Sequence, residues 1–417
     1  MIPCSFANIK VKSLNYEILE SLTLIMAISL TFVFTAQAQN AEYSPVNTVS
    51  NLLKSDQRIT FGGYGQIDYN QPFGNNTLQN GNLDVHRLVL MFGYRFSDKL
   101  SLVSEIEVEH VQEVYIEQAF LNYSFAHYLQ VRAGLMLVPM GIINEYHEPT
   151  NYHGVERPLI DSYIVPTTWR EIGIGFTGII PEASMRYQAY LMNGFSSYNG
   201  AARLSGKNGL RKGRQKGAES IILKPSLAFR AEYYGLLGLN LGLSAYAGQT
   251  QSSLYKSLSR DDQTAITRAD SSVVSVKMLG VDVRYQRKAL EIRGQFYHTW
   301  ISNALEYNVF TASNGVYNDL GSTMVGYYAE VAYNLFYGAK FTKTELIPFV
   351  RYSVYNTQAS VAEGFIENED YQKEVITGGI DWKVVSGVVL KADVQLIKPK
   401  SSEGYSQAFD AGIAIWF

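Results

Sequence analysis

Charged residues able to bind ions recur at every second position within short, otherwise apolar segments. Glu105, Glu107 and Glu109 alternate with Ile106 and Val108, for example. In an extended segment, residues two apart point to the same side, so such a segment has one charged face and one apolar face. Rows of carboxylates and guanidinium groups can bind and pass small ions where they line water. The residues of this kind are Arg87, Glu105, Glu107, Glu109, Arg132, Arg186, Arg230, Arg284, Arg293, Arg351 and Lys391.

A second set of polar side chains lies in one insert, residues 138–170. The insert shows no alternation, and it exceeds the roughly 12–15 residues beyond which an irregular loop is usually functional. Its prolines restrict the backbone, so we expect a stiff loop whose charges set the width and field of a constriction. The candidate residues are Glu145, His147, Glu148, His153, Glu156, Arg157, Asp161 and Arg170.

Metal binding is the alternative role for the polar residues of the insert. His147, Glu148, His153 and Glu156 are possible ligands, but their spacing matches no metal signature. The one cysteine, Cys4, precedes the apolar run of the leader, so the mature chain is expected to have no disulfide or thiolate ligand. The sequence therefore predicts no metal site and no cofactor.

A basic tract without acids follows the insert along the chain. One interpretation is a solvated loop or a loop that contacts lipid phosphate groups. The other is a funnel that raises the local concentration of anions. Its members are Arg203, Lys207, Arg211, Lys212, Arg214 and Lys216.

Sixteen alternating segments must position these side chains. Alternation of apolar and polar residues over this length is typical of strands with two different faces. The predicted strands are 59–69, 83–96, 99–110, 113–124, 127–137, 171–180, 183–193, 221–234, 237–249, 273–286, 289–302, 322–335, 345–355, 373–384, 388–398 and 408–417.

The links between these strands fall into two classes. Those after even-numbered strands are mostly tight, as at Ser97-Asp98, and those after odd-numbered strands are mostly long, as at 138–170 and 194–220. Short turns at one end, long loops at the other and an even strand count are typical of bacterial outer-membrane barrels. We predict an all-β protein, a 16-stranded antiparallel transmembrane β-barrel, with the third outer loop, 138–170, folded inward.

The charged faces must then point into the barrel. An arginine or lysine facing lipid at the bilayer midplane costs about 2–4 kcal/mol, and a barrel of this size is too wide to fill with its own side chains. An aqueous channel follows. The arginines either form a ladder for anions or pair with lumenal acids, for instance Arg132 with Glu117; the supply of acids favours pairing.

The chain start has the features of a secretory signal peptide. The apolar run Leu22–Phe34 is followed by Ala36-Gln37-Ala38, a small-x-small cleavage site. We predict a signal peptide at 1–38, a short periplasmic lead-in at 39–57 and a barrel at 58–417, placed in the bacterial outer membrane after cleavage. The net charge of −3 gives no reason to expect nucleic acid as a partner.

Two other functions were considered. An outer-membrane hydrolase needs a nucleophile beside His110 or His298, and no motif joins them to one, so we predict no enzymatic activity. A structural or adhesive surface barrel is supported by the long outer loops. That alternative predicts a lumen plugged by residues 138–170.

Several motifs give the chain a family resemblance. EIEVEH (105–110), IEQAFLNY (116–123), VRAGLMLVPMGIINEYHEP (131–149), GVERPL (154–159) and VPTTWREIGIGFTG (165–178) resemble the porins related to the phosphate-selective porin O and P family. The resemblance implies a homotrimeric porin in outer-membrane lipid, with its third outer loop folded inward. It also implies passive diffusion of small hydrophilic solutes, anions such as phosphate among them. Glu145, Glu148 and Glu156 depart from an anion-selective constriction.

Overall fold

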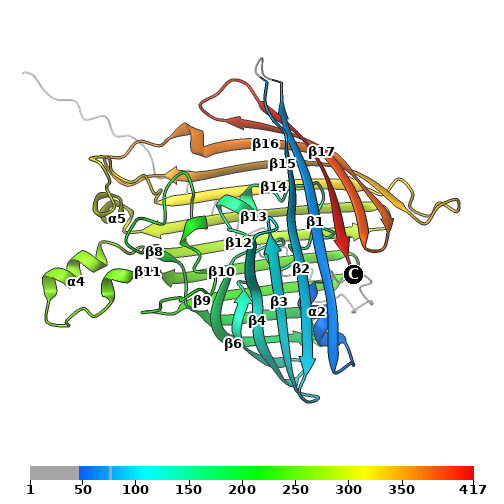
Figure 1. Ribbon diagram of the computed structural model, residues 1–417, viewed down its shortest axis with the longest axis horizontal. Coiled ribbons are helices and arrows are strands. Elements are labelled where there is room, and N and C mark those ends of the chain that lie inside the picture. Colours follow the sequence, from blue (N-terminus) through cyan, green and yellow to red (C-terminus); the bar gives the residue numbers. More distant parts are fainter. Residues whose placement is uncertain (1–46, 75–77) are drawn as a thin grey trace, which may run out of the picture.

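Sixteen antiparallel strands close into one barrel in the computed structural model, which describes residues 47–74 and 78–417 (Figure 1). The predicted signal peptide, 1–38, lies outside the described residues. Each wall strand pairs with the wall strands before and after it along the chain, and β1 pairs with β18 to close the wall. The prediction of a 16-stranded antiparallel barrel is confirmed. The wall strands are β1 (Ile59–Phe73), β2 (Asn82–Arg95), β3 (Leu100–Glu109), β4 (Glu113–Ala126), β5 (Leu129–Leu137), β6 (Arg170–Ile180), β7 (Met185–Met192), β9 (Ser226–Leu236), β10 (Leu239–Gln249), β12 (Ser275–Arg287), β13 (Leu290–Ser302), β14 (Thr323–Tyr333), β15 (Glu345–Ser360), β16 (Gln372–Val385), β17 (Val388–Pro399) and β18 (Ser406–Trp416).

The alternation in each strand divides an outer face from an inner one. On β3, Ile106 is 39% exposed while Glu105 is fully buried inside the barrel. Ile174 on β6 and Leu243 on β10 are likewise exposed on the outer face. An apolar exterior over a polar interior is the arrangement that a lipid-facing barrel requires.

One strand starts later than the alternation predicts. Ile221 to Leu223 are apolar and exposed, yet β9 begins only at Ser226, after Pro225. Side-chain amides take the place of a neighbouring strand there, because Gln215 accepts from the Ile221 N–H and Gln251 accepts from the Leu223 N–H. Local hydrogen bonds to side chains compete with strand pairing in this way.

The long loops contain small elements that the sequence pattern did not predict. Helices α4 and α5 and the two-stranded parallel pair β8–β11 lie together at the left end of the barrel in Figure 1. The bounds of the loop elements are α3 (Ile160–Tyr163), β8 (Ser196–Tyr198), β11 (Gln251–Ser252), α4 (Gln263–Asp270) and α5 (Ala304–Phe310), with 3₁₀ turns η2 (Pro181–Ala183), η3 (Arg211–Gly213), η4 (Ser253–Tyr255) and η5 (Glu369–Tyr371).

The lead-in holds a helix where the sequence showed no periodicity. Helix α2 (Thr48–Lys54) starts at Asn47, whose side chain accepts from the Ser50 N–H, while the Ser50 hydroxyl accepts from the Asn47 N–H. This reciprocal capping stabilises so short a helix. Leu52 is buried and faces Gly93 of β2, at the tight-turn end of the barrel. Within the described residues, no helix is long and apolar enough to cross a membrane.

The main core lies inside the barrel, between the insert and the wall. Val138, Met140 and Trp169 of the insert are fully buried, and wall residues such as Tyr297 are fully buried in the same cluster. The third outer loop is therefore folded inward, as predicted, and fills much of the barrel at its level.

Candidate constriction and basic cavity

One asparagine ties the two ends of the insert together. The Asn144 amide donates to the carbonyls of Val138 and Trp169, at 2.7 and 2.9 Å. Its oxygen accepts from the Trp169 N–H at 2.8 Å. All three partners flank the insert's neck, and Asn144 is fully buried. The neck is thus fixed by side-chain bonds of the kind that usually satisfy buried backbone groups in loops.

Charges on the opposite wall hold the middle of the insert. The Lys391 ammonium donates to the carbonyls of Tyr152 and Gly154, at 2.6 and 2.8 Å. Arg351 donates to the His153 carbonyl and Arg293 to the Asn151 carbonyl. Three predicted pore-lining cations are therefore engaged with the backbone of the insert.

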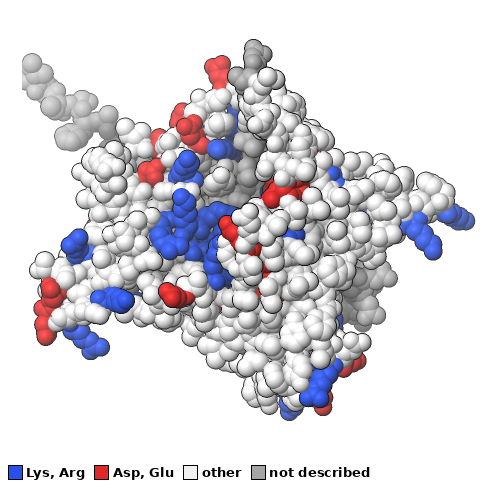
Figure 2. Space-filling view, in the orientation of Figure 1, with Lys and Arg blue, Asp and Glu red and all other residues white. Residues whose placement is uncertain are grey.

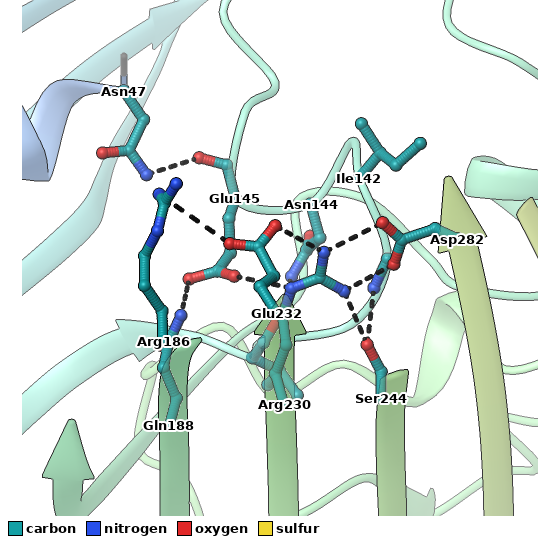
Figure 3. A network of polar contacts seen from close by, with 12 residues as sticks. Asn47, Ile142, Asn144, Glu145, Arg186, Gln188, Arg230, Glu232, Ser244 and Asp282 are labelled. Atoms are coloured by element: carbon teal, nitrogen blue, oxygen red, sulfur yellow. Dashed lines mark hydrogen bonds and ion pairs between the residues drawn. The ribbon is translucent and has the colours of Figure 1, made fainter. Parts of the chain in front are cut away.

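Most of the other lumenal arginines are paired with acids, and Figure 3 shows the network around Arg230 and Arg186. Arg230 lies 2.7 Å from Asp282, 3.0 Å from Glu232 and 3.7 Å from Glu145 of the insert. Arg284 contacts Glu232, and Arg186 lies 3.8 Å from it. Three guanidinium groups thus face three carboxylates, so this network has no excess charge. A free arginine ladder at this level is not what the structure contains.

One pairing suggested by the sequence is wrong. Arg132 donates to Asn122 at 3.0 Å and to Tyr190 at 3.3 Å rather than meeting Glu117. Register explains the difference, because Arg132 lies directly opposite Asn122 in the β4–β5 pair. Glu117 instead lies 3.2 Å from His147. Arg87, which was assigned inward, pairs with Glu107 at 3.3 Å.

A cationic cavity lies on the long-loop side of the insert. Its volume is about 130 Å³, and Glu107, Glu109 and Glu156 are the acids in its wall. A neighbouring cavity of about 950 Å³ shares four cations with it, Arg170, Arg211, Arg214 and Lys216. Figure 2 shows Lys and Arg side chains gathered in one patch near the middle of the face in view. The cationic residues that line the smaller cavity, hereafter the basic cavity, are Arg87, Arg157, Arg170, Arg211, Arg214 and Lys216.

Apart from Arg87, which pairs with Glu107, the arginines of the basic cavity are held by neutral partners. Arg211 and Arg214 donate to the Thr167 carbonyl, at 2.9 and 2.8 Å, and Arg170 donates to the Thr168 hydroxyl at 3.1 Å. Among the residues that the structure describes, no acid lies within ion-pair distance of Arg157, Arg170, Arg211, Arg214 or Lys216. Carbonyl and hydroxyl dipoles orient these cations without cancelling their charge.

The positive charges around the basic cavity lower the pKa values of some of its own cations. Burial, followed by the charges of Arg211 and Arg170, lowers the pKa of Arg214 to about 9. Burial and the charges of Arg214 and Arg170 also lower the pKa of Lys216. Like charges that disfavour each other's protonated form favour a bound anion. The buried Nε atoms of Arg157 and Arg170 also have no hydrogen-bond acceptor among the described atoms.

The basic tract is divided by the fold. Arg211, Arg214 and Lys216 enter the basic cavity, whereas Arg203 donates to the Lys212 carbonyl and braces the tract itself. Lys207 and Lys212 are exposed. Only spatial structure could show this division, because all six residues look alike in sequence.

The four possible metal ligands of the insert do not converge on one point. Glu148 accepts from the backbone and hydroxyl of Thr48, and His153 lies between Asp381 and Glu291, at 2.9 and 3.3 Å. Burial lowers the pKa of His153, but the hydrogen bonds that His153 donates to Asp381 and Glu291 outweigh burial and raise that pKa. His147 and Glu156 instead join two separate groups with wall residues: Glu105–Glu117–His147 and Asp68–His86–Glu156.

The barrel matches solved porins in fold. No family model matches the chain. The anion-selective porin of Comamonas acidovorans superposes with a TM-score of 0.55 at 12% identity, over 86% of this chain and 99% of that one. The channel DcaP of Acinetobacter baumannii gives 0.55 at 11%, and OmpF of Salmonella typhi, solved with daunomycin, gives 0.53 at 11%. Each of these two covers 86% of this chain and is itself covered over 97%.

Sequence similarity is stronger to one protein of Aquifex aeolicus (strain VF5). The two are 31% identical over 359 residues, which cover 82% of this chain and 77% of the other. That protein is described as uncharacterized. With this identity over most of both sequences, the chain belongs to the same family as the Aquifex aeolicus protein, and its fold is the 16-stranded barrel of the porins.

Proposed function

We propose that this protein is an outer-membrane porin that passes small hydrophilic solutes and prefers small anions, phosphate among them. The observation that carries the proposal is the basic cavity, where Arg170, Arg214 and Lys216 have no acidic partner among the described residues. An excess of donors and positive charge beside a constriction attracts anions and replaces part of their hydration shell.

The proposed route passes the insert from one side to the other. The basic cavity is on the long-loop side, and a cavity of about 340 Å³ lies at the tight-turn end. The second cavity is lined by Arg132, Arg186 and Lys54, with Glu145 and Glu232 opposite. Because the wall network around Arg230 has no excess charge, selectivity would come from the basic cavity rather than from an arginine ladder.

The family resemblance of residues 105–178 supports phosphate as the anion to test first. The acids of the insert, which depart from an anion-selective pattern, are largely engaged elsewhere. Glu145 accepts from Gln188 at 2.7 Å and Glu148 accepts from Thr48 at 2.8 Å. Only Glu156 of these three lines the basic cavity.

The same proposal places the protein in the bacterial outer membrane as a homotrimer surrounded by lipid. The apolar outer face and the predicted signal peptide, cleaved after Ala38, support the location. The trimer is supported by the family resemblance. Its mass in detergent, by light scattering, would test it.

Bilayer recording tests the function directly. In a KCl gradient, the wild-type protein should conduct steadily, and its reversal potential should shift toward the equilibrium potential of chloride. Added phosphate should reduce the current. Arg214→Ala and Lys216→Ala should each move the reversal potential toward zero and weaken block by phosphate, because each removes one unpaired positive charge.

Lys207→Ala is the matched control, since it removes the same charge from an exposed position outside the basic cavity. It should leave the reversal potential unchanged. Conductance without ion preference would reduce the proposal to a general porin. An equal effect of Lys207→Ala would assign the preference to overall charge rather than to the basic cavity.

A closed surface barrel is the second candidate, and one observation favours it. The insert is largely buried against the wall, as a structural or adhesive barrel with a plugged lumen would require. Absence of any conductance from a correctly folded protein would support that function over the porin.

A further inference from the structure

We infer that a divalent transition-metal ion binds between the insert and the barrel wall, held by Glu105, Glu117 and His147. Glu105 comes from β3, Glu117 from β4 and His147 from the insert. The site is separate from the basic cavity, and the inference does not depend on which solute crosses the barrel.

The three side chains converge where water cannot reach them. One ligand atom from each lies within 4.8 Å of the other two. Glu105 and Glu117 are fully buried, and His147 is 1% exposed. Ligands about 2.1 Å from a shared tetrahedral ion lie ~3.4 Å apart. His147 Nε2 and Glu117, at 3.2 Å, already have this spacing, and side-chain rotations of about 1 Å would complete the set.

The carboxylates of this group are not satisfied by the protein. Neither oxygen of Glu105 has a hydrogen-bond donor in bonding geometry among the described residues, nor does one oxygen of Glu117. The Gln118 amide, opposite Glu105 in the β3–β4 pair, approaches it as a neutral donor and supplies no charge. Buried carboxylates are normally paired or bound to a metal. These three oxygens without a donor therefore point to a site for a cation.

The histidine is oriented as a metal ligand usually is. Its Nδ1 lies 3.0 Å from the Asn144 carbonyl, to which it can donate. In neutral imidazole this leaves a lone pair on Nε2, which lies 2.8 Å from the Tyr64 hydroxyl and 3.2 Å from Glu117. Ligating histidines commonly donate their second N–H to a carbonyl in this way. A cation bound between Nε2 and the Glu117 carboxylate would remove the repulsion between their lone pairs.

The second group, Asp68–His86–Glu156, shows what a satisfied cluster looks like. Gln66 donates to both oxygens of Asp68, at 3.0 and 2.9 Å, and His86 lies 2.8 Å from one of them. Arg87 lies 2.7 Å from the other nitrogen of His86. Asn70 donates to Glu156 at 3.2 Å. Its own hydrogen bonds complete this group, so we assign it no ion.

The donor set selects the class of metal. Two carboxylates with one imidazole suit Zn²⁺, Mn²⁺ or Fe²⁺, whereas Ca²⁺ and Mg²⁺ favour oxygen alone. Because two ligands are on the wall and one is on the insert, the ion would fasten the insert to β3 and β4. It would bind as the insert docks during folding, as structural metals do.

Metal analysis of the full folded barrel in detergent tests the inference. Protein stripped with EDTA under mild denaturation, refolded with Zn²⁺ or Mn²⁺ and desalted, should retain about one equivalent per chain by mass spectrometry. Refolding with Co²⁺ should give d–d absorption bands typical of Co²⁺ coordinated by oxygen ligands and one nitrogen ligand. Retention of less than a tenth of an equivalent by wild-type protein would overturn the inference and imply protonated carboxyl groups.

Variants of the ligand residues locate the ion. Glu105→Gln and His147→Gln should weaken Zn²⁺ binding at least by the 10–100-fold that changes around metal ligands produce. Glu156→Gln, in the satisfied cluster, should bind as the wild type does. Loss only in Glu156→Gln would place the ion in the other cluster and overturn the assignment. If a variant fails to fold, the wild-type Co²⁺ spectrum and equivalents still decide.

Discussion

At the residue scale, the hydrogen bonds of Asn144 hold the two ends of the insert together. Replacing Asn144 with alanine leaves the buried Trp169 N–H without its acceptor and removes one of two donors from the Val138 and Trp169 carbonyls. An unsatisfied buried group costs about 1–3 kcal/mol, so Asn144→Ala should lower the free energy of unfolding by an amount in that range. Denaturant titration of tryptophan fluorescence would measure it.

The control is Asn199→Ala, at an exposed loop position. It should leave stability unchanged within ~0.5 kcal/mol. Equal destabilisation by both variants would show that Asn144 has no special role at the neck.

Residues of the basic cavity should also respond to anions in the absence of transport. Because their charges raise one another's free energy, a bound anion stabilises the fold, by about 2.7 kcal/mol at 100 times the dissociation constant. Phosphate at constant ionic strength should raise the thermal unfolding midpoint of the wild type. The increase should be much smaller for Arg214→Ala. Lys207→Ala should retain the wild-type increment, and a lost increment there would argue against a local site.

At the scale of the element, the insert should loosen as the pH rises. His153 has a raised pKa when folded, so the stability from its charged form is complete below about 6.5 and is lost above the folded pKa. Burial raises the pKa of Asp161 to about 7, despite hydrogen bonds from Gln295. An acid with a raised folded pKa lowers the stability of the folded state as the pH rises from its unfolded pKa, about 4, to its folded pKa, so Asp161 acts in the same direction.

Limited proteolysis between pH 5 and pH 9 would measure this effect. Cleavage within residues 138–170 should increase with pH in the wild type. Asp161→Asn, which stays neutral and can still accept from Gln295, should shift or reduce the increase. A pH-independent rate in the wild type would contradict the coupling of these two groups to the insert.

At the scale of the whole molecule, the barrel depends on one closing seam. The Gly63 N–H donates to the Phe417 carbonyl, and the Phe417 N–H donates back, both at 2.9 Å. A Cβ on Gly63 would lie 2.5 Å from the Val89 carbonyl and 2.6 Å from the Phe417 ring. Gly63→Ala should therefore destabilise the barrel by about 1–3 kcal/mol, seen as less heat-modifiable protein on SDS gels.

Gly404→Ala supplies the comparison, because no atom lies within 4 Å of a Cβ built there. This variant should fold as the wild type does. If Gly63→Ala folds as well as Gly404→Ala, the strands at the seam can move apart to accept the added Cβ, and the prediction is wrong.

The sequence by itself determined the wall of this protein. The number of strands, their order and their inner and outer faces could be read from alternation, because a strand has a period of two and a charge facing lipid is costly. The position of the inward loop could be read as well, since residues 138–170 lack any alternation. These properties depend only on residues close in sequence or on whether a face of the strand meets lipid or the barrel interior.

Only the tertiary structure decided what the inner charges do. Arg230 meets Glu145, and Lys391 meets the Tyr152 carbonyl, across 85 and 239 residues of chain. Such partners depend on barrel closure and register, which fix the distances between atoms far apart in sequence. The same holds for the basic tract, where only Arg211, Arg214 and Lys216 reach the basic cavity. It holds again for Glu105, Glu117 and His147, which meet only because the insert folds back against β3 and β4.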